Sequence, residues 1–135
     1  MTDIADVNKL TRDYLLTCES LTDLVATRIY FQRLPHGVTL PAISYNAVGG
    51  VPDKYVPGII SPSYSFNLWA SDIMDCYEVY RELYNNLQGI QNITVGDYSI
   101  MSADEEVPSQ DLTDEKYPLM FRVITTFKIM FRAES

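Results

Sequence analysis

The sequence is poor in the residues from which most catalytic and metal centres are built. It contains one histidine, His36, and two cysteines, Cys18 and Cys76, among 135 residues. Zinc needs three or four ligands, and these three residues lie far apart along the chain, so we expect no metal site. A lone histidine in a turn also lacks the nucleophile and orienting group of a catalytic triad. We therefore expect no catalytic residue and no cofactor, and we predict that the protein is not an enzyme.

Missing motifs exclude further classes of protein. The sequence has no P-loop, dinucleotide-binding fingerprint, nucleophile elbow or calcium-loop pattern. It has no run of about 18 apolar residues, so we expect no membrane span. Its first residues carry acids where a secretory signal needs basic and apolar residues, and we expect the chain to be made and used in the cytoplasm. In that compartment the two cysteines are expected to be free, buried thiols.

Basic residues are also scarce. The chain has 10 Lys and Arg against 18 Asp and Glu, which gives a net charge of −8. A surface that neutralises DNA phosphates needs the opposite balance, so general nucleic-acid binding is disfavoured. A local basic patch can still contact DNA, and an acidic channel can let DNA pass without holding it.

The elements that are present indicate one α+β domain over residues 1–135. Hydrophobic residues make up 47% of the chain, which is enough for a single core. Hydrophobic periodicity predicts helices over residues 3–18, 20–26 and 72–88. Alternation predicts strands over residues 28–32, 40–48, 63–69, 93–103 and 119–132. We expect an antiparallel or mixed sheet with the helices packed on one face.

The helix predicted over residues 72–88 has the clearest boundaries. Ser71 is the expected N-cap and Gly89 the expected end, and Ser20 is the expected N-cap of the preceding helix. An apolar stripe with 4-3-4-3 spacing is predicted to pack against the sheet. Its members are Ile73, Tyr77, Tyr80, Tyr84 and Leu87.

Two segments are predicted to lie outside the packed elements. Residues 49–62 hold three prolines and three glycines, and residues 104–117 hold six acids against one lysine. Such compositions are typical of loops or arms that become ordered against partners. The candidate docking residues of the arm are Val51, Asp53, Lys54, Tyr55, Val56 and Ile59. Those of the acidic loop are Asp104, Glu105, Glu106, Asp111, Asp114 and Glu115.

The strand predicted over residues 119–132 has two unlike faces. Its odd-numbered positions are almost all apolar and must face the core. Its even-numbered positions mix apolar and basic residues, which is unusual for a freely solvated face. We predict that a neighbouring copy covers this second face, with Arg122, Lys128, Met130 and Arg132 as the candidate contact residues.

Three stretches of sequence resemble a known family. They are TRIYFQRLPHGVTLPAISYNAVGG at residues 27–50, SFNLWASDIMDCYEVYRELYNNLQGI at residues 65–90 and FRVITTFKIMF at residues 121–131. Together they resemble the tail terminator family of long-tailed bacteriophages, also called tail completion or tail-to-head joining proteins. The similarity covers nearly the whole chain, but it consists of packing residues and includes no signature of chemistry.

The resemblance implies a hexameric ring whose sheets surround a lumen. Such a ring caps the completed tail tube, ends its polymerisation and joins the tail to the head connector. The implied partners are copies of the same chain, the tail tube protein, a head connector or stopper protein, and DNA that passes through the lumen without sequence recognition. The implied location is the head-proximal end of the tail in the virion, and the host cytoplasm during assembly.

Three alternatives remain open from the sequence. The first is another neck component, such as a head-completion adaptor or stopper that binds the portal side. The second is a nucleic-acid-binding module that uses Arg122, Lys128 and Arg132, although the net charge argues against this. The remaining alternative is an enzyme of an unrecognised type, which the missing catalytic constellation disfavours.

Overall fold

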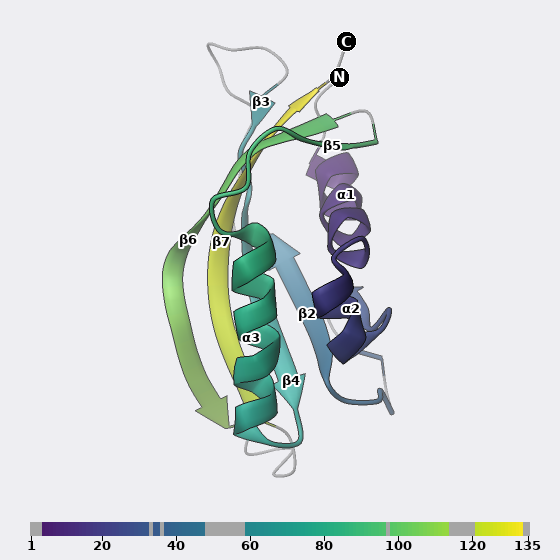
Figure 1. Ribbon diagram of the computed structural model, residues 1–135, viewed down its shortest axis with the longest axis vertical. Coiled ribbons are helices and arrows are strands. Elements are labelled where there is room, and N and C mark those ends of the chain that lie inside the picture. Colours follow the sequence, from purple (N-terminus) through teal and green to yellow (C-terminus); the bar gives the residue numbers. More distant parts are fainter. Residues whose placement is uncertain are drawn as a thin grey trace.

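Three helices cover one face of a mixed, strongly curled sheet of seven strands (Figure 1). This computed structural model describes residues 4–32, 34–35, 37–47, 59–96, 98–113 and 121–133. The predicted α+β class is confirmed, including the mixed sheet with its helices on one face.

The helices are α1 (Ile4–Leu16), α2 (Glu19–Val25) and α3 (Ile73–Leu87). The strands are β1 (Ile29–Phe31), β2 (Ala42–Ala47), β3 (Ile59–Ile60), β4 (Ser63–Ala70), β5 (Ile93–Val95), β6 (Tyr98–Thr113) and β7 (Phe121–Ala133). The sheet order is β1-β2-β4-β7-β6-β5, and β3 also pairs with β7. The β1–β2 pair is parallel and all the other pairs are antiparallel.

The core lies between the sheet and the helices. Tyr64, Phe66 and Leu68 of β4 and Phe127 and Phe131 of β7 are fully buried there. They alternate with half-buried or exposed residues, as a strand with one covered face requires. The predicted core face of the last strand is confirmed. Its described members Val123, Thr125, Phe127, Ile129 and Phe131 are buried, and Phe121 is partly buried and packs against the core.

The buried stripe of α3 differs from the predicted one. Its fully buried members are Cys76, Val79, Leu83 and Leu87. Of the predicted stripe, Leu87 alone is fully buried, and Tyr84 is 38% exposed. Ile73, Tyr77 and Tyr80 are partly buried and pack against the core beside this row. Both rows of the helix are apolar, so spacing alone did not decide which row faces the sheet.

Two helix starts also differ from the prediction by one or two residues. Asp72 caps α3, because its carboxylate accepts a hydrogen bond from the backbone N–H of Met74 at 2.9 Å. The expected cap, Ser71, precedes it. Helix α2 begins after Cys18, so Ser20 lies inside the helix. The predicted end of α3 is confirmed, since Gly89 follows the last turn with a φ of +78°.

The loop prediction for residues 104–117 is wrong over residues 104–113. These residues belong to β6, which pairs with β7 as far as Thr113 opposite Phe121. A composition rich in acids indicates that side chains are solvated, but it does not tell whether the backbone pairs with another strand. Here the backbone of β7 supplies hydrogen-bond partners along the acidic strand. Register shifts at three places accompany the pairing. Residues 114–117 lie outside the described part of the chain.

The predicted arm of residues 49–62 also needs correction at its end. Ile59 and Ile60 form β3 opposite Arg132 and Phe131, and the Ile60 side chain is 1% exposed. The backbone carbonyl of Pro62 then accepts a hydrogen bond from the N–H of Ile129 at 3.0 Å. Residues 59–62 therefore pair with the C-terminal part of β7, next to the part of β7 that pairs with β4. Val51, Asp53, Lys54, Tyr55 and Val56 lie outside the described residues.

The strand predicted over residues 93–103 is a hairpin of β5 and the start of β6. Gly96 lies at its turn with a φ of +59°, a backbone conformation that favours glycine. A Cβ atom at this position would lie 2.9 Å from Cδ2 of Leu10. The turn therefore packs closely against α1.

Candidate interaction surfaces

The first candidate surface is the side of the sheet opposite the helices, which we call the open face. It carries alternate residues of β4 and β7, and none of the three described helices lies over it. From β4 it includes Ser63, Ser65, Asn67 and Trp69. From β7 it includes Arg122, Ile124, Thr126, Lys128, Met130 and Arg132.

A compact polar cluster lies near one end of this open face. Trp69 and Arg122 are cross-strand partners, and the guanidinium carbon of Arg122 lies 5.0 Å from the centre of the Trp69 ring. The indole N–H of Trp69 donates to Oγ of Ser44 at 3.0 Å. Nη1 of Arg122 donates to Oδ1 of Asn67 at 3.5 Å, which is a long hydrogen bond. Three neighbouring strands thus hold the guanidinium in place.

One donor of this cluster is buried without an acceptor. Among the described residues, Nε of Arg122 has no hydrogen-bond partner. Arginine presents five N–H donors in a planar fork that matches a carboxylate or a phosphate. The Arg122 side chain is partly exposed, so its outer Nη donors can receive an anionic oxygen in addition to the Asn67 amide, whereas the buried Nε cannot be reached from solvent.

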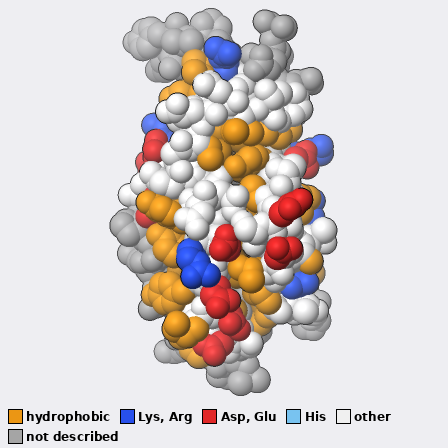
Figure 2. All heavy atoms as spheres, viewed as in Figure 1, with side chains coloured by type: hydrophobic (Ala, Val, Ile, Leu, Met, Phe, Trp, Pro, Cys, Tyr) orange, Lys and Arg blue, Asp and Glu red, His pale blue; other side chains and the backbone are white. Residues whose placement is uncertain are grey.

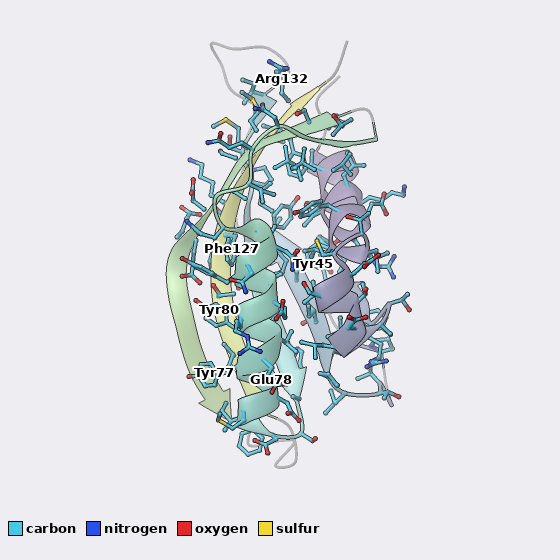
Figure 3. The ribbon with its side chains drawn as sticks, viewed as in Figure 1. Tyr45, Tyr77, Glu78, Tyr80, Phe127 and Arg132 are labelled. Carbon is cyan, nitrogen blue, oxygen red and sulfur yellow. The ribbon has the colours of Figure 1, made fainter. Side chains whose placement is uncertain are left out.

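The other predicted contact residues lie further along the same strand face. Lys128 is exposed and stands between Ser63 of β4 and Asp104 of β6 in the pairing register. Arg132 is exposed at the far end of β7 (Figure 3). Met130 is half-buried between them. The four residues share one strand face but are spread along its length, so they do not form one compact site.

Among the described residues, the ion pairs that form lie away from the open face. They join Lys9 to Asp13 at 3.3 Å and Arg81 to Glu82 at 3.7 Å. The cations of the open face therefore have carboxylate-binding capacity that the described part of the chain does not use.

The described acids of the predicted docking loop fasten β6 to its neighbours. Glu105 accepts hydrogen bonds from the Tyr80 hydroxyl at 2.7 Å and the Thr125 hydroxyl at 2.6 Å. Asp104 accepts one from Nε2 of Gln88 at 3.4 Å, and Glu106 accepts one from the hydroxyl of Ser63. The backbone of Asp111 pairs with Val123, and Asp114 and Glu115 lie outside the described residues.

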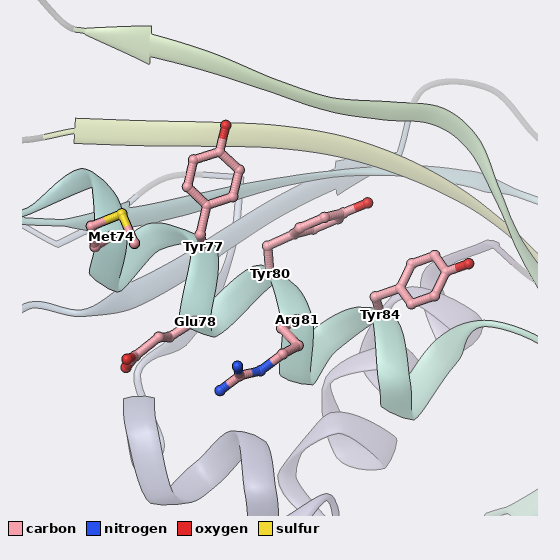
Figure 4. Close-up of a pocket in the computed structure, with 6 residues that line it drawn as sticks. All are labelled: Met74, Tyr77, Glu78, Tyr80, Arg81 and Tyr84. Atoms are coloured by element: carbon pink, nitrogen blue, oxygen red, sulfur yellow. The ribbon is translucent and has the colours of Figure 1, made fainter.

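The second candidate surface is a hollow along α3, with a volume of about 500 Å³ (Figure 4). Its lining residues are Met74, Tyr77, Glu78, Tyr80, Arg81 and Tyr84. Met74 is 67% exposed, and the rings of Tyr80 and Tyr84 lie 6.1 Å apart. The prediction that the tyrosines pack against the core is confirmed for Tyr77 and Tyr80, which are partly buried there, but the prediction missed that the three rings also line a hollow at the surface. The sequence does contain a signal for this surface. The apolar face of α3 is two residue rows wide, and the sheet fully buries only the row that contains Cys76, Val79 and Leu83.

Charge is distributed unequally over the molecule. Acidic side chains gather on the helix side, in the lower half of the view in Figure 2. Among the acids of the three helices and the N-cap of α3, those whose side chains are described are Asp13, Glu19, Asp23, Asp72, Asp75, Glu78 and Glu82. The described bases of these helices are Lys9, Arg12 and Arg81, of which Arg12 donates to the backbone carbonyls of Thr27 and Ile29.

Neither surface has the features of a catalytic or metal centre. In the described part of the chain, no group of three or more His, Cys, Asp or Glu residues is arranged to hold a metal ion. Cys18 and Cys76 are buried free thiols. Burial raises the pKa of the Cys18 thiol, which keeps it protonated and poorly nucleophilic at neutral pH. The predicted turn histidine, His36, lies outside the described residues.

None of the described helices is long and apolar enough to cross a membrane.

A solved virion structure contains a chain of similar fold. The structure is described as the virion of a native gene transfer agent (GTA) particle. The two chains superpose with a TM-score of 0.62 over 84% of each, at 14% sequence identity. At this identity the likeness to the GTA virion chain shows a shared fold. No family model matches the sequence, and no curated protein matches it.

Proposed function

We propose that this chain is a non-enzymatic structural protein of a phage-like particle. The observation that carries the proposal is the fold shared with the chain of the GTA virion, which spans 84% of both chains. The match covers most of both chains, so the comparison concerns the whole fold and not one local motif.

Within such a particle, copies of the chain form a ring, expected to be hexameric, at the head-proximal end of the tail. The ring caps the tail tube, ends its polymerisation and joins the tail to the head connector. The support is the resemblance of residues 27–50, 65–90 and 121–131 to tail terminator proteins, together with an open sheet face that mixes apolar and basic side chains. Its partners are other copies, the tube protein and a connector or stopper protein, and DNA passes through its lumen.

Candidate contact segments follow from this arrangement. The open face, with Arg122, Lys128, Met130 and Arg132, meets either the lumen or a neighbouring copy. The arm that includes Val51 and Ile59 and the acidic residues of 104–115 are candidates for docking to the tube or to the head side. The tyrosine hollow of α3 is a further candidate, because its apolar side chains are accessible.

The experiment is to purify the chain and measure its mass by light scattering, alone and with polymerising tail tube protein. Electron microscopy then records the length of the tubes and the structure of their ends. The expected result is a ring-sized assembly and shorter tubes that carry a cap at one end. A chain that stays monomeric and leaves tube length unchanged would exclude the terminator role.

A head-side position is the second candidate, because the matched GTA chain is described only as part of a virion. An adaptor or stopper binds portal protein and leaves tube growth unchanged. Pull-down against tube protein and portal protein in parallel separates the two roles. Binding to the portal side alone would move the protein from the tail end to the head side of the joint.

A further inference from the structure

We propose that Arg122 binds a carboxylate of a second copy of this chain, and that the open face is therefore a contact between copies and not a DNA-facing wall. The inference deepens the proposed function and rests on its assembly of copies. It chooses between the two alternatives for the open face, which meets either a neighbouring copy or the lumen.

The Arg122 guanidinium has few hydrogen-bond acceptors among the described residues of its own chain. Its one hydrogen bond to a described residue is the 3.5 Å contact with Asn67, and its Nε is buried without an acceptor. A buried donor without a partner lowers stability, and a charged one lowers it more than a neutral one. Stacking on Trp69 orients the fork but supplies no oxygen acceptor. Nε is closed to solvent, but the side chain as a whole is partly exposed, so a carboxylate of another copy would meet the outer Nη donors and neutralise the guanidinium charge there.

The second argument is the kind of surface that surrounds Arg122. Tryptophan, arginine and methionine are enriched at protein–protein contacts, and stacked Trp and Arg side chains are frequent binding hot spots. The open face combines Trp69 and Arg122 with the half-buried apolar residues Ile124 and Met130. Contacts with DNA phosphates need charge above all, and here the most exposed cations, Lys128 and Arg132, stand apart from the cluster.

The third argument is charge complementarity between copies. The chain has 18 acids against 10 bases, so each copy offers more carboxylates than it can pair internally. The described helices are rich in acids, whereas β7 brings three cations to the open face. Asp104 of β6 lies opposite Lys128 in the pairing register, whereas neither residue opposite Arg122 at the Trp69 cluster is an acid. We infer a heterologous contact, which joins this cluster of one copy to an acidic surface of the next; repetition of such a contact forms a ring where its rotation closes.

The test compares Arg122→Gln with Lys128→Gln, which removes the same charge from the same strand face. Arg122→Lys is the third variant, because it keeps the charge and loses the planar fork. Light scattering over a dilution series at low and physiological salt gives the dissociation constant of the assembly. Circular dichroism and the unfolding midpoint establish that each variant is folded, and fluorescence anisotropy with duplex DNA runs in parallel.

The expected result is that Arg122→Gln weakens assembly by about tenfold or more, as loss of one partner of a buried charge pair does. Lys128→Gln is expected to change it by less than about threefold, as exposed charges do, and Arg122→Lys to fall between the two. If Arg122→Gln does not fold, the comparison of Arg122→Lys with Lys128→Gln decides. Assembly of folded Arg122 variants with wild-type affinity would overturn the inference.

The outcomes also separate this inference from the proposed function. If the wild type assembles but caps no tubes, and substitution of Arg122 weakens the assembly, the terminator role is wrong and the Arg122 contact between copies is supported. If the wild type assembles and caps tubes, and substitution of Arg122 has no effect on assembly, the terminator role is supported and the Arg122 contact is wrong. Loss of DNA binding without loss of assembly would show that Arg122 meets phosphate, and a wild-type monomer at all concentrations would overturn both proposals.

Discussion

Buried tyrosine hydroxyls connect the helices to the sheet. The Tyr45 hydroxyl donates to the backbone carbonyl of Asn8 at 2.7 Å, and the Tyr64 hydroxyl donates to Oδ1 of the same residue at 2.6 Å. The Tyr14 hydroxyl donates to the carbonyl of Asn86 at 2.6 Å and so joins α1 to α3. Each ring fills apolar space while its hydroxyl satisfies a polar group. These contacts position the helix layer on one face and leave the other face open.

The tyrosines predict how stability depends on alkaline pH. Burial raises the pKa of Tyr14, Tyr45 and Tyr64 well above the ordinary value of about 10. Between the unfolded and the native pKa, the unfolded chain has lost protons that the native state retains. The free energy of unfolding is therefore insensitive to these groups below about pH 10 and falls as pH rises above it. Urea denaturation from pH 7 to 11.5 measures the decline.

The double variant Tyr45→Phe/Tyr64→Phe tests the cause of that decline. It is expected to be less stable at pH 7 by about 1–3 kcal/mol, because two hydrogen bonds are lost. Its stability should then fall less steeply than that of the wild type above about pH 10. Tyr84→Phe, at a tyrosine that is 38% exposed, is the matched control. Equal slopes for the double variant and the wild type would contradict the assignment.

Single side chains also mark where sequence reasoning failed. Ser71 and Asp72 are both good N-caps, and only the backbone geometry selects Asp72. The tyrosines of α3 were expected to pack against the core; Tyr77 and Tyr80 do so while partly buried, whereas Tyr84 is 38% exposed. In both cases neighbouring residues had equal local propensity, and tertiary contacts decided between them.

At the scale of elements, Glu105 joins α3 to the two long strands. It accepts hydrogen bonds from Tyr80 of α3 and Thr125 of β7, and its own backbone N–H donates to Oε1 of Gln88 at 2.8 Å. We expect Glu105→Ala to lower the free energy of unfolding by about 1–3 kcal/mol, because two buried or half-buried hydroxyls lose an acceptor. Chemical denaturation measures the change.

Two further variants show whether that effect is specific. Glu105→Gln retains one acceptor oxygen and should lose less stability than Glu105→Ala. Glu78→Ala removes an exposed carboxylate of α3 and should change stability by less than about 0.5 kcal/mol. If Glu78→Ala and Glu105→Ala were equally costly, general charge effects would explain both and the bridging role would be wrong.

The turn between β5 and β6 gives a second prediction at this scale. Gly96 and Gly89 both have positive φ, but only a Cβ at Gly96 would approach another side chain, at 2.9 Å from Leu10. We expect Gly89→Ala to cost about 1 kcal/mol from backbone strain alone, and Gly96→Ala to cost more. In a Leu10→Ala background the excess at Gly96 should disappear. A double-mutant cycle by thermal denaturation measures that coupling.

The cycle also has an outcome that contradicts the packing argument. If Gly96→Ala costs the same in both backgrounds, Leu10 does not restrict the turn, and the strain is confined to the backbone. The Gly89→Ala variant then gives the size of that strain in a turn with open space around it.

Elements with strong periodicity were predicted well, and elements defined by composition were not. The alternation of β7 predicted its two faces, because a half-covered strand must alternate between core and exterior. The acidic residues of β6 were predicted as a loop because a high density of charge indicates solvated side chains. Side chains near the edge of a sheet are solvated as well, so charge density does not distinguish a loop from such a strand. Its pairing with β7 depends on contacts distant in sequence, which no local pattern reports.

For the whole molecule, the sequence predicted the class of fold and the open face, but not the hollow along α3. The open face was predicted from β7 alone, because the second face of this strand mixes polar and apolar residues. The hollow depends on how α3 is rotated on the sheet, which is set by the fit of Cys76, Val79 and Leu83 against the strands. Rotation of a helix with two apolar rows is a packing outcome, so it needed the structure.

The last prediction concerns DNA and follows from the charge of the whole chain. With a net charge of −8, the protein as a whole repels a polyanion, and the open face offers three cations at most. Neutralising three phosphates would give a salt slope of about −3 in log K against log salt, too small for useful affinity at physiological salt. We therefore expect no saturable binding of duplex DNA in 0.15 M salt by fluorescence anisotropy.

A basic variant of the open face provides the contrast. Ser63→Lys/Ser65→Lys adds two cations opposite Lys128 and Thr126, on the strand that pairs with β7. It is expected to bind DNA more tightly than the wild type at low salt, with a slope steeper by about two. Strong binding by the wild type, lost on changing Arg122, Lys128 and Arg132 to Gln, would instead favour a nucleic-acid-binding module. Weak binding by the wild type agrees with an open face that contacts another copy, and it is also required of whichever surface lines a lumen, because the wall of a ring must not hold DNA that passes through it.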